Sequence, residues 1–128
     1  MAELSTHQIG DGRRFIQAVD EAGVVSSAAL WFWSTQANAW HYVLASPSVE
    51  PDKDMPVKIA AVLSLMPAGF AVNRDNLKLY PPDAPLVRSL QSLMQTGPGV
   101  SAIRMTGNVI NGVRIEDAYV YRLNRRAG

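Results

Sequence analysis

The residues best suited to chemistry lie in the last quarter of the chain, over 100–123, which reads VSAIRMTGNVINGVRIEDAYVYRL. The Asn-Gly pair at 111–112 stands between two apolar runs. This pair favours a type I′ hairpin turn, because both central residues of that turn have φ > 0. The turn predicts a register in which Arg104 faces Tyr119 and lies diagonal to Asp117. A guanidinium, a phenol and a carboxylate this close can stack, form an ion pair or bind an anionic group.

The predicted register divides the hairpin into two faces, because successive side chains on a strand point to opposite sides. The apolar face, expected to lie in the core, comprises Ile103, Met105, Ala118 and Val120. The polar and aromatic face comprises the candidate binding residues Arg104, Thr106, Asp117, Tyr119 and Tyr121. The second face is either a stabilising cross-strand cluster exposed to water, or a surface that binds a ligand or partner through Arg104 and the two tyrosines.

A second hairpin is predicted over 29–46, where ALWFWS and WHYVLAS flank the polar link TQANA. Its register is open by one residue, and a slip of one residue exchanges the two faces of a strand. In one register, a single face carries Trp31, Trp33, Trp40 and Tyr42. In the other, Trp31 and Trp33 share a face with His41 and Val43, and the core face carries Leu30, Phe32, Tyr42 and Leu44. We favour the second register, because it gives an aliphatic and aromatic core face and keeps His41 off that face.

Trp31 and Trp33 are therefore also candidate binding residues. Core packing is the usual reason for tryptophans gathered in one short stretch, because each ring supplies a large contact area. If these two lie on the outer face, they form an apolar patch that monomeric proteins rarely leave bare. The favoured register thus predicts self-association or a protein partner.

Three helices and a short strand complete the predicted elements. Apolar residues at helical spacing predict helices over about 11–22, 55–66 and 84–96. The candidate N-caps of these helices are Asp11, Asp54 and Asp83. The run NLKLY predicts a strand over 76–80. The chain is expected to form a single domain over 1–128, with loose ends at 1–10 and 124–128.

The predicted helix over 55–66 is apolar nearly all round. Its only polar side chains are Lys58 and Ser64. A helix of this kind is buried on more than one side. It is therefore either a central packing helix or a helix that meets another chain.

The predicted order is helix, hairpin, helix, strand, helix, hairpin. Hairpins pair antiparallel strands, whereas a strand–helix–strand connection favours parallel ones. The sequence therefore predicts an α+β fold with a mixed five-stranded sheet, formed by two hairpins plus one strand, and about three helices mainly on one face.

Composition argues against several classes of function. The chain has 128 residues, a formal net charge of +1 and no cysteine. The lack of cysteine rules out disulfides, thiolate metal sites and cysteine nucleophiles. A dedicated duplex-DNA binder is usually more basic. The sequence shows neither an apolar signal region nor a run long enough to span a bilayer, so we expect a soluble cytoplasmic protein that does not contact the membrane.

Catalytic and cofactor motifs are missing from the sequence. The TGPG run at 96–99 follows a predicted helix instead of preceding one, so it does not indicate a phosphate loop. The two histidines, His7 and His41, lack partners at metal-ligand spacing. We interpret Asp20 as ordinary helix surface and Arg122 as part of a solubilising basic tail. The sequence predicts no catalytic residue, no metal and no cofactor, and it disfavours an enzyme without excluding one.

The runs TGPGVSAIRMTGNVINGVRIEDAYVYRL, ALWFW with WHYVLAS, and DAPLVRSL resemble a group of short bacterial proteins with no assigned activity. The resemblance covers nearly the whole chain. It implies a bacterial cytoplasmic origin and assigns no role to any residue.

Three functions are compatible with these observations. The favoured one is a small interaction or assembly module that forms a homo-oligomer or binds a protein partner, which would explain the apolar helix over 55–66 and the aromatic hairpin. The second is a small enzyme or small-molecule-binding protein with its site around Arg104, Asp117 and Tyr119. The third is single-stranded nucleic-acid binding through exposed aromatic rings and the basic tail, which the low net charge disfavours.

Overall fold

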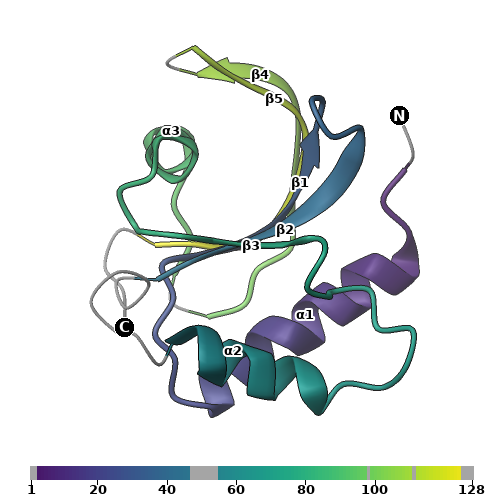
Figure 1. The fold of residues 1–128 in the computed structure, drawn as a ribbon. Coiled ribbons are helices and arrows are strands. Elements are labelled where there is room, and N and C mark those ends of the chain that lie inside the picture. Colours follow the sequence, from purple (N-terminus) through teal and green to yellow (C-terminus); the bar gives the residue numbers. More distant parts are fainter. Residues whose placement is uncertain (1–2, 47–54, 98, 111, 125–128) are drawn as a thin grey trace.

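The computed structural model describes residues 3–46, 55–97, 99–110 and 112–124. Its elements follow the predicted order (Figure 1). They are α1 (Thr6–Glu21), β1 (Ala28–Ser34), β2 (Ala39–Ala45), α2 (Met55–Ser64), β3 (Leu77–Tyr80), α3 (Pro85–Leu93), β4 (Ile103–Ile110) and β5 (Val113–Leu123). The predicted α+β class is confirmed.

The five strands form one mixed sheet in the order β3-β2-β1-β5-β4. β2 and β3 are parallel, and the other pairs are antiparallel. α1 and α2 cover one face of the sheet and α3 covers the other (Figure 1), so the helices lie mainly on one face, as expected. Both faces of the sheet are therefore buried, each in its own apolar cluster.

The predicted register of the β4–β5 hairpin is confirmed. Arg104 pairs with Tyr119, and Met105 pairs with Ala118. Met105 and Ala118 are buried in the cluster that lies beneath α3. The Asn-Gly turn thus places the predicted apolar face in a core, although Asn111 itself lies outside the described residues.

The favoured register of the β1–β2 hairpin is wrong by one residue. Trp31 pairs with Tyr42, and Trp33 pairs with Trp40. These four rings therefore share the face that α1 covers. The favoured register would be expected if only one face of the hairpin were buried. The α3 face is buried too, and aliphatic side chains such as Leu30 fill it, so the aromatic face is free to pack under α1.

α1 begins earlier than the sequence indicated. Ser5 is its N-cap: the Ser5 Oγ accepts a hydrogen bond from the Gln8 backbone N–H at 3.1 Å, and the Gln8 Oε1 accepts one from the Ser5 N–H at 2.9 Å. This reciprocal pair is a capping box. Asp11 lies inside the helix and is not its cap; its carboxylate accepts a hydrogen bond from the Ala71 N–H at 2.8 Å. The prediction of a loose segment over 1–10 therefore fails from residue 6 to residue 10.

Three aromatic side chains of the sheet donate hydrogen bonds to backbone carbonyls of α1. Trp31 Nε1 donates to Gln8 O at 2.9 Å, Tyr42 Oη to Gly12 O at 2.9 Å, and Tyr121 Oη to Ile9 O at 2.6 Å. The helix can approach the rings this closely because Gly12 has no side chain. A Cβ at Gly12 would lie 2.6 Å from Trp31 Nε1 and closer still to Tyr121 Oη.

α3 is shorter than the helix predicted over 84–96. Its N-cap is Ala84, which makes no side-chain capping bond, so the prediction of Asp83 as the cap is wrong. The helix ends at Leu93, before Thr96, because Thr96 bonds to β5 instead. The Thr96 N–H donates to Leu123 O at 2.7 Å, and the Thr96 Oγ1 accepts from the Leu123 N–H at 2.9 Å.

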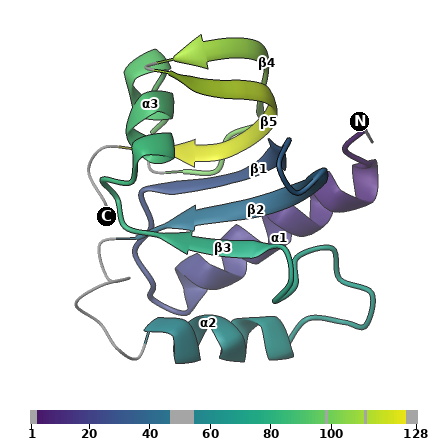
Figure 2. The ribbon, with the colours of Figure 1, turned by 45° about the horizontal axis from the view of Figure 1, so that its top comes forward.

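α2 lies beside α1 on the same face of the sheet (Figure 2). It buries Ile59 and Val62 in the shared apolar cluster. Its predicted cap, Asp54, lies outside the described residues. In the part of the chain that the structure describes, no helix is long and apolar enough to cross a membrane.

Candidate functional site

The ion pair predicted on the β4–β5 hairpin is present. Arg104 Nε donates to Asp117 Oδ1 at 2.6 Å, and Arg104 Nη2 donates to Asp117 Oδ2, so the contact is bidentate. The Asp117 side chain is only 4% exposed, whereas that of Arg104 is 42% exposed. Hydrogen bonding to Asp117 is the main cause that raises the pKa of Arg104. Each group is occupied by the other, so this geometry favours a cross-strand stabilising role.

The remaining residues of that predicted surface do not stay together. Tyr119 is half-buried and lies beside Tyr121, with 5.3 Å between the ring centroids. Tyr121 is fully buried under α1, and this burial raises its pKa. Thr106 is exposed on β4. The structure therefore brings Arg104, Asp117 and Tyr119 together, but it withdraws Tyr121 from the surface because α1 covers that part of the face.

Trp31 and Trp33 lie in the core, so the expectation of an exposed tryptophan patch is wrong. Trp31 is fully buried and meets the edge of Tyr42, with 5.1 Å between the centroids. Trp33 packs on Trp40 at 5.5 Å in a similar arrangement. Neither ring offers a face on which a base or a partner could stack.

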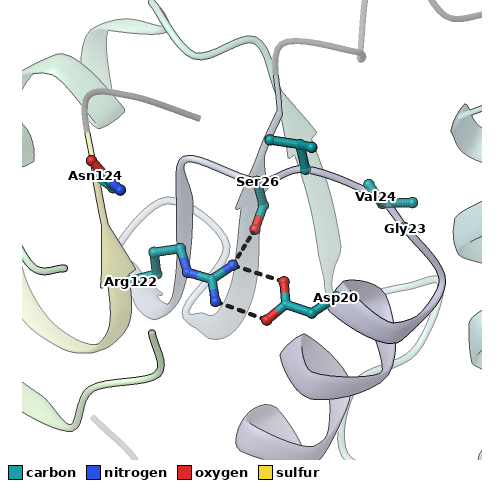
Figure 3. A pocket seen from close by; sticks show the side chains of 7 residues that line it. Asp20, Gly23, Val24, Ser26, Arg122 and Asn124 are labelled. Carbon is teal, nitrogen blue, oxygen red and sulfur yellow. Dashed lines mark hydrogen bonds and ion pairs between the residues drawn. The ribbon is translucent and has the colours of Figure 1, made fainter. Parts of the chain in front are cut away.

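Arg122 is a buried residue whose environment the sequence did not reveal. Its Nη1 and Nη2 donate to the two carboxylate oxygens of Asp20 at 2.8 Å each, and Nη1 also donates to Ser26 Oγ at 2.9 Å (Figure 3). Its Nε donates to Gly99 O at 3.3 Å. The interpretation of Arg122 as part of a solubilising tail is wrong, because Arg122 is buried. Asp20 does lie on the exposed surface of α1, but its carboxylate is engaged by Arg122. Arg125 and Arg126 lie outside the described residues.

A bulge in β5 explains why Arg122 points toward α1. Leu30 pairs with Val120, but its neighbour Ala29 pairs with Arg122, so the register shifts by one residue at Tyr121. Without this shift Arg122 would share the α3 face with Val120. No residue type at this position signals the bulge.

A pocket of about 240 Å³ adjoins the Arg122–Asp20 pair. Its lining consists of Asp20, Gly23, Val24, Val25, Ser26, Arg122 and Asn124. Asp20 neutralises Arg122, and the bonds described above use four of the five guanidinium N–H groups. The pocket therefore has little capacity to hold an anion. The Arg122–Asp20 pair instead links the end of α1 to β5.

The two histidines lie in different surroundings. His7 Nε2 lies 3.1 Å from Asp11 Oδ2. His41 is half-buried on β2, and its pKa is lowered first by burial and then by Lys78. Among the described residues, no group of three or more histidines and carboxylates lies close enough to hold a metal ion.

α2 presents an apolar face to the solvent. Val57 is 68% exposed, and Ala61 lies exposed one turn further along the same side of the helix. Leu65, the residue directly after α2, is 81% exposed. We call these three residues the outer face of α2. The prediction that α2 is buried on more than one side is therefore not met within the described chain, where only the side facing α1 and the sheet is covered.

The second apolar feature is a groove between α2 and β3. β3 is the edge strand of the sheet, and it is the strand next to α2 in Figure 2. It consists of two adjoining hollows of about 180 and 290 Å³. Both hollows are lined by Ala60, Leu63 and Arg74. We call this feature the α2–β3 groove. No sequence pattern indicates this groove, because its walls come from segments whose packing depends on the parallel pairing of β3 with β2.

Comparisons of the chain with protein-family models, with curated proteins and with solved structures find no match. The resemblance to short bacterial proteins thus stays an expectation, and no residue takes a role from a relative.

Proposed function

We propose that the protein is a small interaction module that associates with a second copy of itself through the outer face of α2. The observation that carries this proposal is the exposure of Val57 on α2 and of Leu65 directly after it, on a helix whose opposite side is already packed. Burying a side chain of this kind contributes about 1.5–3 kcal/mol. A second copy would supply the cover that this face lacks within the described chain.

The spacing of the outer face suits a two-fold pairing. Val57 and Ala61 are four residues apart on α2, and Leu65 follows four residues later in the turn that ends the helix, where its N–H donates to Val62 O at 3.1 Å. The three side chains therefore continue one apolar stripe. When two copies of α2 cross antiparallel about a two-fold axis, Val57 of one copy meets Leu65 of the other. Ala61 then lies near the axis, where its small side chain allows the helices to approach closely. The net charge of +1 opposes this association only weakly.

Sedimentation equilibrium over a wide range of protein concentration tests the proposal. We expect the wild type to be dimeric at high concentration and a Leu65→Glu variant to be monomeric throughout. A Val109→Glu variant is the matched control, because Val109 is 69% exposed but lies on β4, away from α2. A wild type that is monomeric at every concentration, or a Val109→Glu variant as impaired as Leu65→Glu, would refute self-association through this face.

The two alternative functions receive less support. A ligand site around Arg104 requires a guanidinium that is available to the ligand, and the bidentate bond to Asp117 engages it. Single-stranded nucleic-acid binding requires exposed rings, and Trp31 and Trp33 are buried. Neither alternative has a feature in the described chain comparable to the open apolar face of α2.

A further inference from the structure

We propose that the α2–β3 groove binds an extended, apolar segment of a partner protein that carries an acidic side chain. The groove lies on the side of α2 that faces β3, whereas Val57 and Leu65 lie on the outer face. The two surfaces are thus distinct, and this proposal goes beyond self-association.

The walls of the groove are suited to aliphatic side chains. The hollow nearer the strand is lined mainly by apolar residues of α2 and β3, among them Ile59, Leu63, Leu77 and Leu79. The adjoining hollow continues along the end of α2 toward Phe70 and Val72. A chain that runs along the groove would bury alternate side chains in it, because alternate residues of an extended segment point the same way.

β3 offers backbone groups to such a segment. The Tyr42 N–H of β2 donates to Asn76 O, directly before β3, and the Ser46 N–H, directly after β2, donates to Tyr80 O. The even-numbered residues along β3 therefore direct their backbone groups toward β2. The odd-numbered residues direct theirs outward, away from the sheet. In the part of the chain that the structure describes, no strand lies beyond β3. The N–H and C=O of Leu79 are therefore placed to pair with an added strand.

Arg74 determines the charge of the segment. Its side chain lines both hollows and is exposed, and it makes no hydrogen bond or ion pair within the described chain. A carboxylate on the bound segment would supply the bidentate partner that this guanidinium lacks. A lysine at the same place would be repelled. An acidic residue among apolar ones is thus the composition that the groove selects.

The segment that pairs with β3 must be short. β3 has four residues, and Pro81 and Pro82 follow it directly. Proline has no N–H to donate to a ladder, so pairing cannot extend past Tyr80. Specificity then depends on the side chains in the groove and on Arg74 more than on a long run of backbone bonds.

The test uses fluorescent synthetic peptides in which valine and serine alternate around one central glutamate, together with matched peptides that carry lysine there. Binding to the full-length protein is followed by fluorescence anisotropy, and the site is located by shifts of backbone amide signals in NMR spectra. We expect the glutamate peptide to bind, the lysine peptide not to bind, and the amide of Leu79 to shift. An Arg74→Glu variant should bind the glutamate peptide at least about tenfold more weakly, since the change removes a charge-assisted hydrogen bond and places two like charges together.

Two controls separate this proposal from self-association and from a general charge effect. Arg88→Glu makes the same change of charge on α3, on the opposite face of the sheet, and should bind like the wild type. Leu65→Glu should abolish association of two copies yet leave peptide binding intact. The peptide groove is refuted if neither peptide binds, or if Arg74→Glu and Arg88→Glu bind the glutamate peptide equally. It is also refuted if decanoate, an apolar chain with a carboxylate, binds in an Arg74-dependent way while the peptides do not.

Discussion

Replacement of Gly12 by alanine should destabilise the protein, although alanine is the better helix former. A Cβ at this position would lie 2.6 Å from Trp31 Nε1 and 2.8 Å from Tyr121 Cε2, well inside ordinary van der Waals contact. Both rings are fully buried and cannot move aside. α1 must therefore shift away from the sheet.

The magnitude follows from what this shift disturbs. Forcing an extra methyl group into a packed core costs about 1–3 kcal/mol. The shift also lengthens the three hydrogen bonds that Trp31, Tyr42 and Tyr121 donate to carbonyls of α1, each worth about 1 kcal/mol. The higher helix propensity of alanine returns about 1 kcal/mol. We expect Gly12→Ala to lower the free energy of unfolding by about 2–4 kcal/mol.

Gly10→Ala is the matched control in the same helix. Nothing lies within 4 Å of a Cβ at Gly10, so this variant should be more stable than the wild type by about 0.5–1 kcal/mol. Both free energies come from urea denaturation followed by tryptophan fluorescence. A Tyr121→Phe change should recover part of the loss in Gly12→Ala, because it removes the atom nearest to the added methyl group. If Gly12→Ala is as stable as Gly10→Ala, then α1 does not approach the rings of Trp31 and Tyr121 as closely as described.

Three further predictions concern the caps and buried polar groups. Ser5→Ala should lower the free energy of unfolding by about 1 kcal/mol in urea denaturation, because it removes the capping box of α1, and an unchanged stability would contradict that box. Asp20→Ala should lower the free energy of unfolding by about 2–3 kcal/mol, since Arg122 then stays buried without its counter-charge. This cost is below that of breaking a fully buried pair, because the Asp20 side chain is 38% exposed. Burial raises the pKa of Tyr42 and of Tyr121 above the ordinary value of 10.0, so the unfolded chain releases these protons first. The stability that these two protonated tyrosines contribute is therefore present below pH 10.0 and lost as the pH rises above it. Denaturation at a series of alkaline pH values will show this loss as a falling free energy of unfolding. The fall should be less steep in Tyr42→Phe.

The β4–β5 hairpin shows how far local sequence can determine structure. An Asn-Gly turn and the strict alternation of strand side chains were enough to predict that Arg104 faces Tyr119 and reaches Asp117. Both effects act between residues close together along the chain. The order of elements was predictable for the same reason, because each helix and strand carries its own apolar period.

The β1–β2 hairpin shows where local sequence stops being sufficient. Its strands are apolar on both sides, so the pattern fits two registers that differ by one residue. The choice between them depends on which helix lies over which face. Trp31 is buried under α1, where the Gln8 carbonyl accepts its indole N–H, and α1 can come close enough only because residue 12 is glycine.

The sequence by itself determined the class of fold, the order of its elements, the register of the last hairpin and the apolar character of α2. These follow from period, turn chemistry and composition, which are properties of short stretches of chain. Only the tertiary structure decided which faces are covered. It buried the tryptophans, left Val57 and Leu65 exposed, and turned Arg122 toward Asp20 through a bulge in β5. Burial depends on contacts between segments far apart in the chain, such as Asp20 and Arg122, and no local pattern encodes such a contact.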